Sequence, residues 1–177
     1  MQTDDHDMSN EQTLSILNRL HAIERFSLAN YARYAHPWTP ENKQHVHEAI
    51  LDIADEQQRY ANSIGSLIVD RNGYVEGGSF PVRYAALNDV SLDCFARRVI
   101  EDQKRIIQAV ETWVGELTGD TAARELAQEV LGAEKGHLDN LLEAMDEVTN
   151  KPVRSTAEHD SVVAASTIAA ISLALAV

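Results

Sequence analysis

The chain has 177 residues, of which 28 are acidic and 15 basic, and its formal net charge is −13. This length suits one domain, and an apolar fraction of 44% is enough to build a hydrophobic core. The acidic balance argues against nucleic-acid binding, which relies on basic patches that face phosphates. It is compatible with a protein whose overall field attracts cations.

Residues 1–12 form an acidic, polar stretch, which we expect to be an N-terminal tail. This stretch has neither the basic start nor the apolar run of a secretory signal. Cys94 is the single cysteine of the chain, so an intrachain disulfide is excluded, as is an iron–sulfur cluster built from this chain alone. These features predict a cytoplasmic protein.

Residues 161–177 contain no charged side chain. The segment is slightly short for a membrane span and lacks aromatic or basic anchors, so a membrane location is not favoured. We interpret 151–177 as a linker followed by an apolar segment that packs on a neighbouring subunit or on the rest of the chain. This interpretation predicts a homo-oligomer. A tail anchor and a disordered tail are the alternatives.

Between the two ends, residues 13–150 carry four long segments with helical periodicity and no strand-like alternation of any length. Pro37 follows the first helix, the Asn72-Gly73 pair closes the second, and Ser91 is a plausible N-cap of the third. The four predicted helices span 11–35, 40–70, 91–117 and 121–149.

The lengths of the connections predict how these helices are arranged. The first and second helices are joined by a short connection, as are the third and fourth, so each pair is expected to be antiparallel. The connection over residues 70–90 is long enough to run the whole length of a bundle. The sequence therefore predicts an all-α, antiparallel four-helix bundle with one long crossover.

Two glutamates fall inside the apolar stripes of these helices. On a helical wheel, Glu134 lies at the centre of the fourth stripe and His137 near its edge, and Glu24 lies in the middle of the first stripe with His21 one turn before it. A carboxylate in a core is unfavourable by several kcal/mol unless something pairs with it. A shared metal ion is one such partner, and a core network with an arginine or a tyrosine is the other.

Two sequence runs carry a resemblance to a known family. Residues 17–24 read LNRLHAIE and residues 134–141 read EKGHLDNL, a Glu on one helix and a Glu-x-x-His step on another. This pattern resembles the ferritin-like diiron carboxylate superfamily, and most of all the bacterioferritins, over roughly residues 14–148. The resemblance implies a ferritin-like bundle that binds Fe(II) and passes an electron from it to oxygen or peroxide.

The two middle helices depart from that family pattern. On the second helix, the expected Glu-x-x-His step reads Gln57 to Tyr60, and sliding by one residue gives Glu56 and Arg59 instead. We prefer Gln57 and Tyr60, because the wheel turns Glu56 well away from the centre of the stripe.

The third helix should supply one more carboxylate. Gln103 is the polar residue inside its stripe, whereas Asp102 lies at the margin and Glu101 points away.

Several carboxylates are needed to balance two irons. We therefore predict at most one tightly held iron or other divalent ion, with Glu24, Glu134 and His137 as ligands and Gln57 and Gln103 as weak or outer ligands. No haem is expected, because Gln58 stands where bacterioferritins carry the haem-binding methionine. A structural or interaction bundle that has lost its metal centre is the main alternative. An enzyme that oxidises a substrate is the third.

Overall fold

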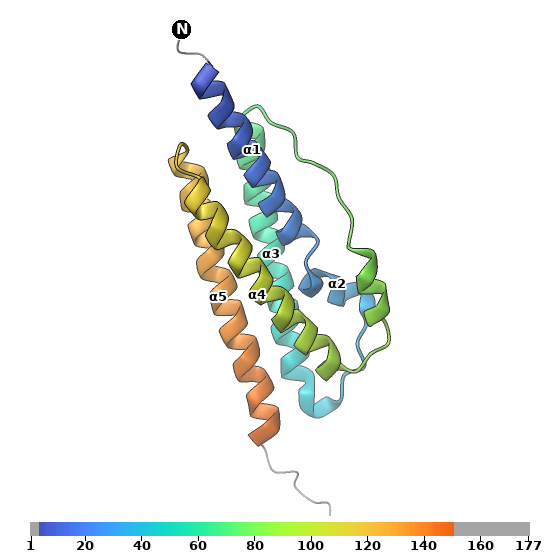
Figure 1. Cartoon of the computed structure of the whole chain (residues 1–177). Coiled ribbons are helices and arrows are strands. Elements are labelled where there is room, and N and C mark those ends of the chain that lie inside the picture. Colours follow the sequence, from blue (N-terminus) through green and yellow to red (C-terminus); the bar gives the residue numbers. More distant parts are fainter. Residues whose placement is uncertain (1–3, 151–177) are drawn as a thin grey trace, which may run out of the picture.

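The computed structural model describes residues 4–150, and this part of the chain is helical with no β-strand (Figure 1). The predicted all-α class is therefore confirmed. The elements are α1 (Asp4–Arg25), α2 (Leu28–Ala35), the 3-10 helix η1 (Glu41–Lys43), α3 (Gln44–Asp70), the 3-10 helix η2 (Val82–Leu87), α4 (Leu92–Glu116) and α5 (Thr121–Asn150).

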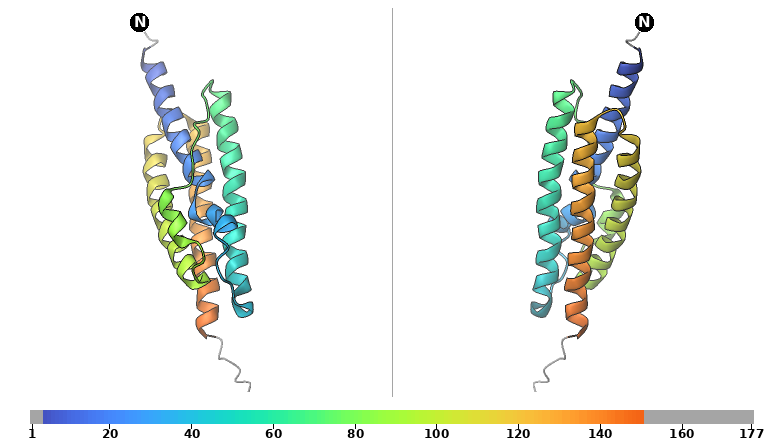
Figure 2. Two further views of the ribbon diagram at one scale, coloured as in Figure 1. Left: turned by 90° about the vertical axis from the view of Figure 1, so that its right-hand side faces the viewer. Right: turned by 90° about the vertical axis from the view of Figure 1, so that its left-hand side faces the viewer.

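Four of these helices, α1, α3, α4 and α5, lie side by side along one long axis, and the short α2 packs against α3 (Figures 1 and 2). The closest pairs are α1 with α3 and α4 with α5, and the two helices of each pair run in opposite directions. Between α3 and α4 the chain returns along the outside of the molecule, over residues 71–91, to the other end of the helices.

The first helix differs from the prediction at both of its ends. It begins at Asp4, inside the range expected to be a tail, and it breaks after Arg25 instead of continuing to residue 35. The break occurs because the Ser27 hydroxyl accepts a hydrogen bond from the backbone N–H of Asn30 and so caps a new helix, α2. Asp102 of α4 accepts the Leu28 N–H, which otherwise would have no partner at this helix start.

The ends of the other helices agree with the sequence signals. Asn72 adopts a left-handed conformation (φ 58°), and the Gly73 N–H closes α3 by donating to the Ile68 carbonyl at 2.9 Å. A Cβ at Gly73 would lie 2.4 Å from a methyl of Leu14 and 3.1 Å from the Ile68 carbonyl oxygen, so a larger residue would have to displace the Leu14 side chain. Ser91 caps α4, as predicted.

Side-chain hydrogen bonds at Asn18 and at Tyr84 help to fix the crossover to the helices. The Asn18 side chain of α1 donates to the Tyr74 carbonyl at 3.1 Å and accepts the Glu76 N–H at 2.8 Å. Farther along, the buried Tyr84 of η2 donates its hydroxyl to Asp102 at 3.1 Å. Burial and the Asp102 charge raise the pKa of Tyr84 to about 12, so its hydroxyl keeps the proton that it donates.

The core consists of two apolar clusters along the axis of the molecule. One gathers around α2 and the start of α4, and it includes Leu28, Ile50, Ile53, Phe95, Val99 and Leu141. The other gathers around α1 and the end of α4, and it includes Leu17, Leu20, Ile64, Ile106, Val110 and Val130. On α3, α4 and α5, a stretch with buried polar side chains separates the residues of the two clusters. Glu24 lies between the second-cluster residues of α1 and the first-cluster residues of α2.

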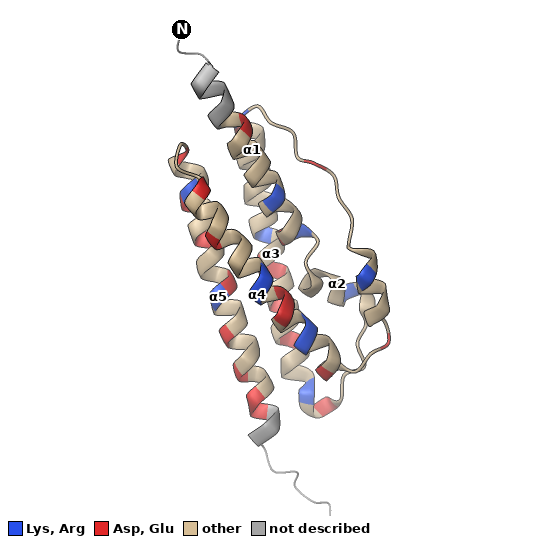
Figure 3. Cartoon of the chain, in the orientation of Figure 1, with Lys and Arg blue, Asp and Glu red and all other residues tan. Residues whose placement is uncertain are grey.

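Acidic residues recur along α5 (Figure 3). The glutamates Glu125, Glu129 and Glu143 of this helix are exposed. No helix among residues 4–150 is long and apolar enough to cross a membrane. The apolar segment 161–177 lies outside the described residues.

Candidate functional site

Between the two apolar clusters lie five buried polar side chains, which we call the polar layer: Glu24, Gln57, Gln103, Glu134 and His137. Each of the four long helices contributes at least one of them. Glu24, Gln57 and Glu134 have no exposed surface, and Gln103 and His137 are 1% and 6% exposed. The burial predicted for these residues is confirmed, and their role as metal ligands stays a prediction.

Glu24 and Glu134 bring two carboxyl groups together in the middle of the molecule. Neither oxygen of Glu24 accepts a hydrogen bond from a described residue, and Oε2 of Glu134 also has no donor. Burial raises the pKa of Glu24 well above its usual range, and the neighbouring Glu134 carboxyl, close enough to share a proton, raises it further. Among the described residues, no lysine or arginine contributes to the pKa of Glu24. Its charge therefore has to be balanced by a proton or by a bound cation.

Gln57 is held by hydrogen bonds at both ends of its amide. Its oxygen accepts from the Ser27 hydroxyl at 2.5 Å and from the Asn30 amide at 3.4 Å, and its nitrogen donates to Oε1 of Glu134 at 2.9 Å. The oxygen, which is the only atom of this amide that can bind a cation, thus points away from the carboxyl pair. Gln57 is therefore placed as a donor to Glu134 and not as a ligand.

His137 lies between two carboxyl groups. Its Nδ1 is 3.7 Å from Oε2 of Glu134, and its Nε2 is 2.8 Å from Oε2 of Glu56, whose side chain is 38% exposed. Burial lowers the pKa of His137, but the neighbouring Glu134 and Glu56 carboxylates outweigh that effect and raise the pKa above its ordinary value. Nδ1 has no hydrogen-bond partner among the described residues.

The helical-wheel analysis did not predict the contact between Glu56 and His137. Glu56 lies off the centre of its stripe, as predicted, yet its side chain reaches around to the histidine. Arg59, one turn farther along α3, lies 3.6 Å from the other oxygen of Glu56. The only available signal was the alternative register, which put Glu56 and Arg59 at the positions of the family's Glu-x-x-His step.

Glu101, Asp102 and Gln103, the three candidates on α4, differ in burial and in their partners. Gln103 is buried with its Nε2 unpaired among the described residues, and Glu101 is exposed and paired with Arg98. Asp102 is buried as well, but it is fully engaged in holding α2 and the crossover. Its second oxygen accepts from Arg105 at 2.8 Å. No carboxylate of α4 therefore belongs to the polar layer.

Tyr60 and His21 lie at the edge of the layer. Tyr60, the counterpart of a histidine in the family pattern, is half-buried, and burial together with Glu129, Glu56 and Glu24 raises its pKa. Burial, and then the Arg25 charge, lowers the pKa of His21. Both side chains are therefore neutral near pH 7.

The unpaired atoms of the polar layer are of the types that bind metal ions, but they are not gathered at one point. Two carboxylates and one imidazole nitrogen with unpaired atoms are the kind of ligands that Fe(II) and similar ions take. They lie in a row, Glu24 beside Glu134 and Glu134 beside His137. Across residues 4–150, no group of three or more His, Cys, Asp or Glu side chains is gathered around one point that could hold a metal ion. Ligation would require the carboxyl groups to turn toward Nδ1 of His137.

The comparisons with known proteins add no assignment. No family model matches the chain, and neither a curated protein nor a solved structure matches it. The polar layer itself is thus what bears on the function of this protein.

Proposed function

We propose that the protein is a ferritin-like four-helix bundle that binds one divalent cation, Fe(II) above all, in its polar layer. One observation carries the proposal. Glu24 and Glu134 are fully buried, they contact each other from α1 and α5, and three of their four oxygens have no donor among the described residues. The direction of the four long helices and the long crossover are compatible with the ferritin-like arrangement (Figure 2).

A bound cation explains these carboxyl groups better than a core network does. Unpaired buried acceptors are rare in proteins, because each forgoes hydrogen bonds worth about 1–3 kcal/mol. Three such atoms on two neighbouring side chains indicate a missing positive partner, and no arginine or lysine supplies it. A divalent ion would bind both carboxylates and remove their mutual repulsion.

The surroundings of His137 support its role as a third ligand. Histidines that bind a metal through one ring nitrogen usually donate the other N–H to a carboxylate. Here Nε2 lies 2.8 Å from Glu56, which favours a proton on Nε2 and leaves the lone pair of Nδ1 facing Glu134. Glu56 then orients the ring from outside, which is a different role from the ligand role that the alternative register assigned to it.

The same layer limits what the bound ion can do. Gln57 and Gln103 occupy the positions where a two-iron centre needs further carboxylates, and both are neutral. Bound Fe(II) would supply an electron to oxygen or peroxide. The residues of the chain would hold the ion, with few negative charges to stabilise its oxidised form. We therefore expect slow oxidation of Fe(II).

A structural bundle without a metal is the second candidate, and Gln57 favours it. Its amide nitrogen already donates to Glu134, so part of the layer is satisfied without any ion. In this alternative, Glu24 and Glu134 share a proton and His137 pairs with Glu56 and Glu134.

An anaerobic calorimetric titration with Fe(II) tests the proposal. We expect about one tightly bound Fe(II) per chain in the wild type, no tight binding in Glu134→Gln, and wild-type binding in the control Glu125→Gln, which removes an exposed carboxylate from the same helix. A wild type that binds no Fe(II) would support the structural bundle. Equal binding by both variants would place the site elsewhere.

A further inference from the structure

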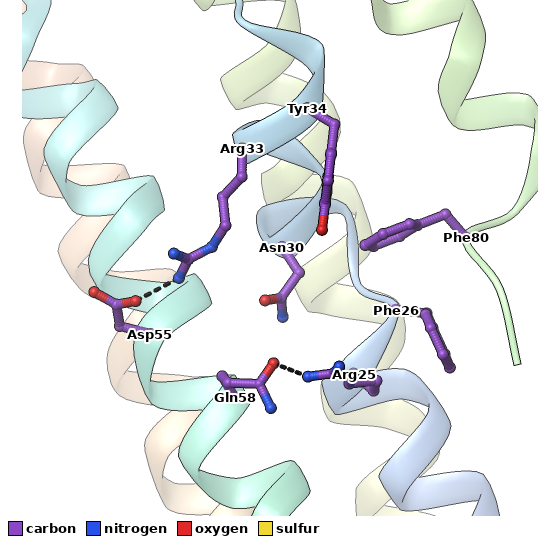
Figure 4. Close-up of a pocket in the computed structure, with 8 residues that line it drawn as sticks. All are labelled: Arg25, Phe26, Asn30, Arg33, Tyr34, Asp55, Gln58 and Phe80. Atoms are coloured by element: carbon purple, nitrogen blue, oxygen red, sulfur yellow. Dashed lines mark hydrogen bonds and ion pairs between the residues drawn. The ribbon is translucent and has the colours of Figure 1, made fainter. Parts of the chain in front are cut away.

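A cavity that is separate from the polar layer opens where α1 bends into α2. It has a volume of about 310 Å³ and is lined by residues of α1, α2, α3 and the crossover (Figure 4). Pockets for small molecules typically span roughly 300–1,000 Å³, so this one suits a ligand with a single ring. None of the five residues of the polar layer lines it.

One wall of the cavity is positively charged. Arg25 and Arg33 line it together with a single acidic residue, Asp55, to which Arg33 is paired. Arg25 donates to the amide oxygen of Gln58 and forms no ion pair with a described residue. In a chain with a net charge of −13, this wall carries two positive charges against one negative.

The opposite wall is aromatic. Figure 4 shows Tyr34, Phe80 and Phe26 on the side away from Asp55 and Gln58. The Phe80 ring packs edge-on against Phe26 at 5.6 Å and against Tyr34 at 5.4 Å between ring centroids. Tyr34 remains 64% exposed, so much of this aromatic surface is open to a ligand.

We propose that this cavity binds a small aromatic carboxylate, with its anionic group on Arg25 and its ring against Tyr34 and Phe80. A guanidinium without an acidic partner is suited to a carboxylate, because its fork of N–H donors matches the two oxygens. A flat ring gains edge or stacked contacts with Tyr34 and Phe80. A cationic ligand is disfavoured, because two arginines and only one aspartate line the cavity. An inorganic anion is also disfavoured, because it would make no use of the aromatic wall.

The test measures the binding of sodium benzoate to the full-length, metal-free protein by isothermal titration calorimetry. Benzamide has the same ring without the charge, and inorganic phosphate has charge without a ring. Arg25→Gln and Tyr34→Ala alter the two walls at exposed positions, so the fold is expected to persist. Arg124→Gln, which removes an exposed arginine of α5, is the matched control.

We expect benzoate to bind the wild type and Arg124→Gln equally, and Arg25→Gln to weaken binding about tenfold through the loss of a charge-assisted hydrogen bond. Tyr34→Ala should weaken benzoate binding and leave phosphate unaffected. Equal binding of benzamide, equal effects of Arg25→Gln and Arg124→Gln, or no benzoate binding would each overturn the proposal. Phosphate that binds as well as benzoate would overturn its aromatic half. Because the protein is metal-free in all of these measurements, the results do not depend on the metal site of the proposed function.

Discussion

Replacing Glu24 with glutamine should stabilise the metal-free protein at alkaline pH while removing its metal affinity. The Glu24 carboxyl is fully buried without a donor, and burial and Glu134 raise its pKa. A carboxyl whose pKa is higher in the folded state stabilises the fold fully below its unfolded pKa of about 4.3. That contribution is lost as the pH rises through the folded pKa. Glutamine avoids this loss, and its amide can donate to the unpaired Oε2 of Glu134.

The gain corresponds to relieving one or two unsatisfied buried groups, about 2 kcal/mol at pH 8, or a Tm increase of roughly 4–8 °C for a chain of this size. Thermal unfolding of both proteins with chelator at pH 5 and pH 8 measures it, and the difference should shrink at pH 5. Saturating Fe(II), at about 100 times its Kd, should stabilise the wild type alone by about 2.7 kcal/mol. A metal-free Glu24→Gln variant that is less stable than the wild type at pH 8 would refute this account of the carboxyl pair.

Three further outcomes are expected. Glu56→Gln should weaken Fe(II) binding by about 10- to 100-fold, because the variant loses the carboxylate that orients His137, and calorimetry against the exposed-site control Glu125→Gln measures the difference. Asp120→Ala should lower the free energy of unfolding by about 1–2 kcal/mol, since Asp120 caps α5 at the Ala123 N–H and pairs with Arg71, which directly follows α3. An unchanged denaturation midpoint would contradict this. Truncation after Asp160 should reduce the oligomer size measured by light scattering, if the uncharged segment 161–177 packs between subunits.

Periodicity alone predicted the four long helices and the burial of the polar layer. Glu24, Glu134 and Gln57 interrupt otherwise apolar stripes, and a wheel places such residues correctly because the 3.6-residue repeat hardly changes within a helix. Ser91 and the Asn72-Gly73 pair marked helix ends because their capping is local.

The features that the sequence could not reveal depend on contacts between helices. The break at Ser27 has a local N-cap, but it is completed by Asp102, which accepts the Leu28 N–H and lies 74 residues after Leu28. Neither the contact of Glu56 with His137 nor the direction of the Gln57 amide follows from one helix, because both are decided by partners on another. The wheel could place Gln57 inside the core but could not tell a ligand from a donor.

The central claim is that the unpaired carboxyl groups of Glu24 and Glu134 hold one cation. Crystals of the full chain prepared anaerobically with Fe(II), measured at the iron absorption edge, test it most directly through anomalous difference density. The account predicts one peak per chain, about 2.0–2.2 Å from oxygens of Glu24 and Glu134 and from Nδ1 of His137. An empty polar layer at saturating Fe(II), or two peaks within it, would contradict the account.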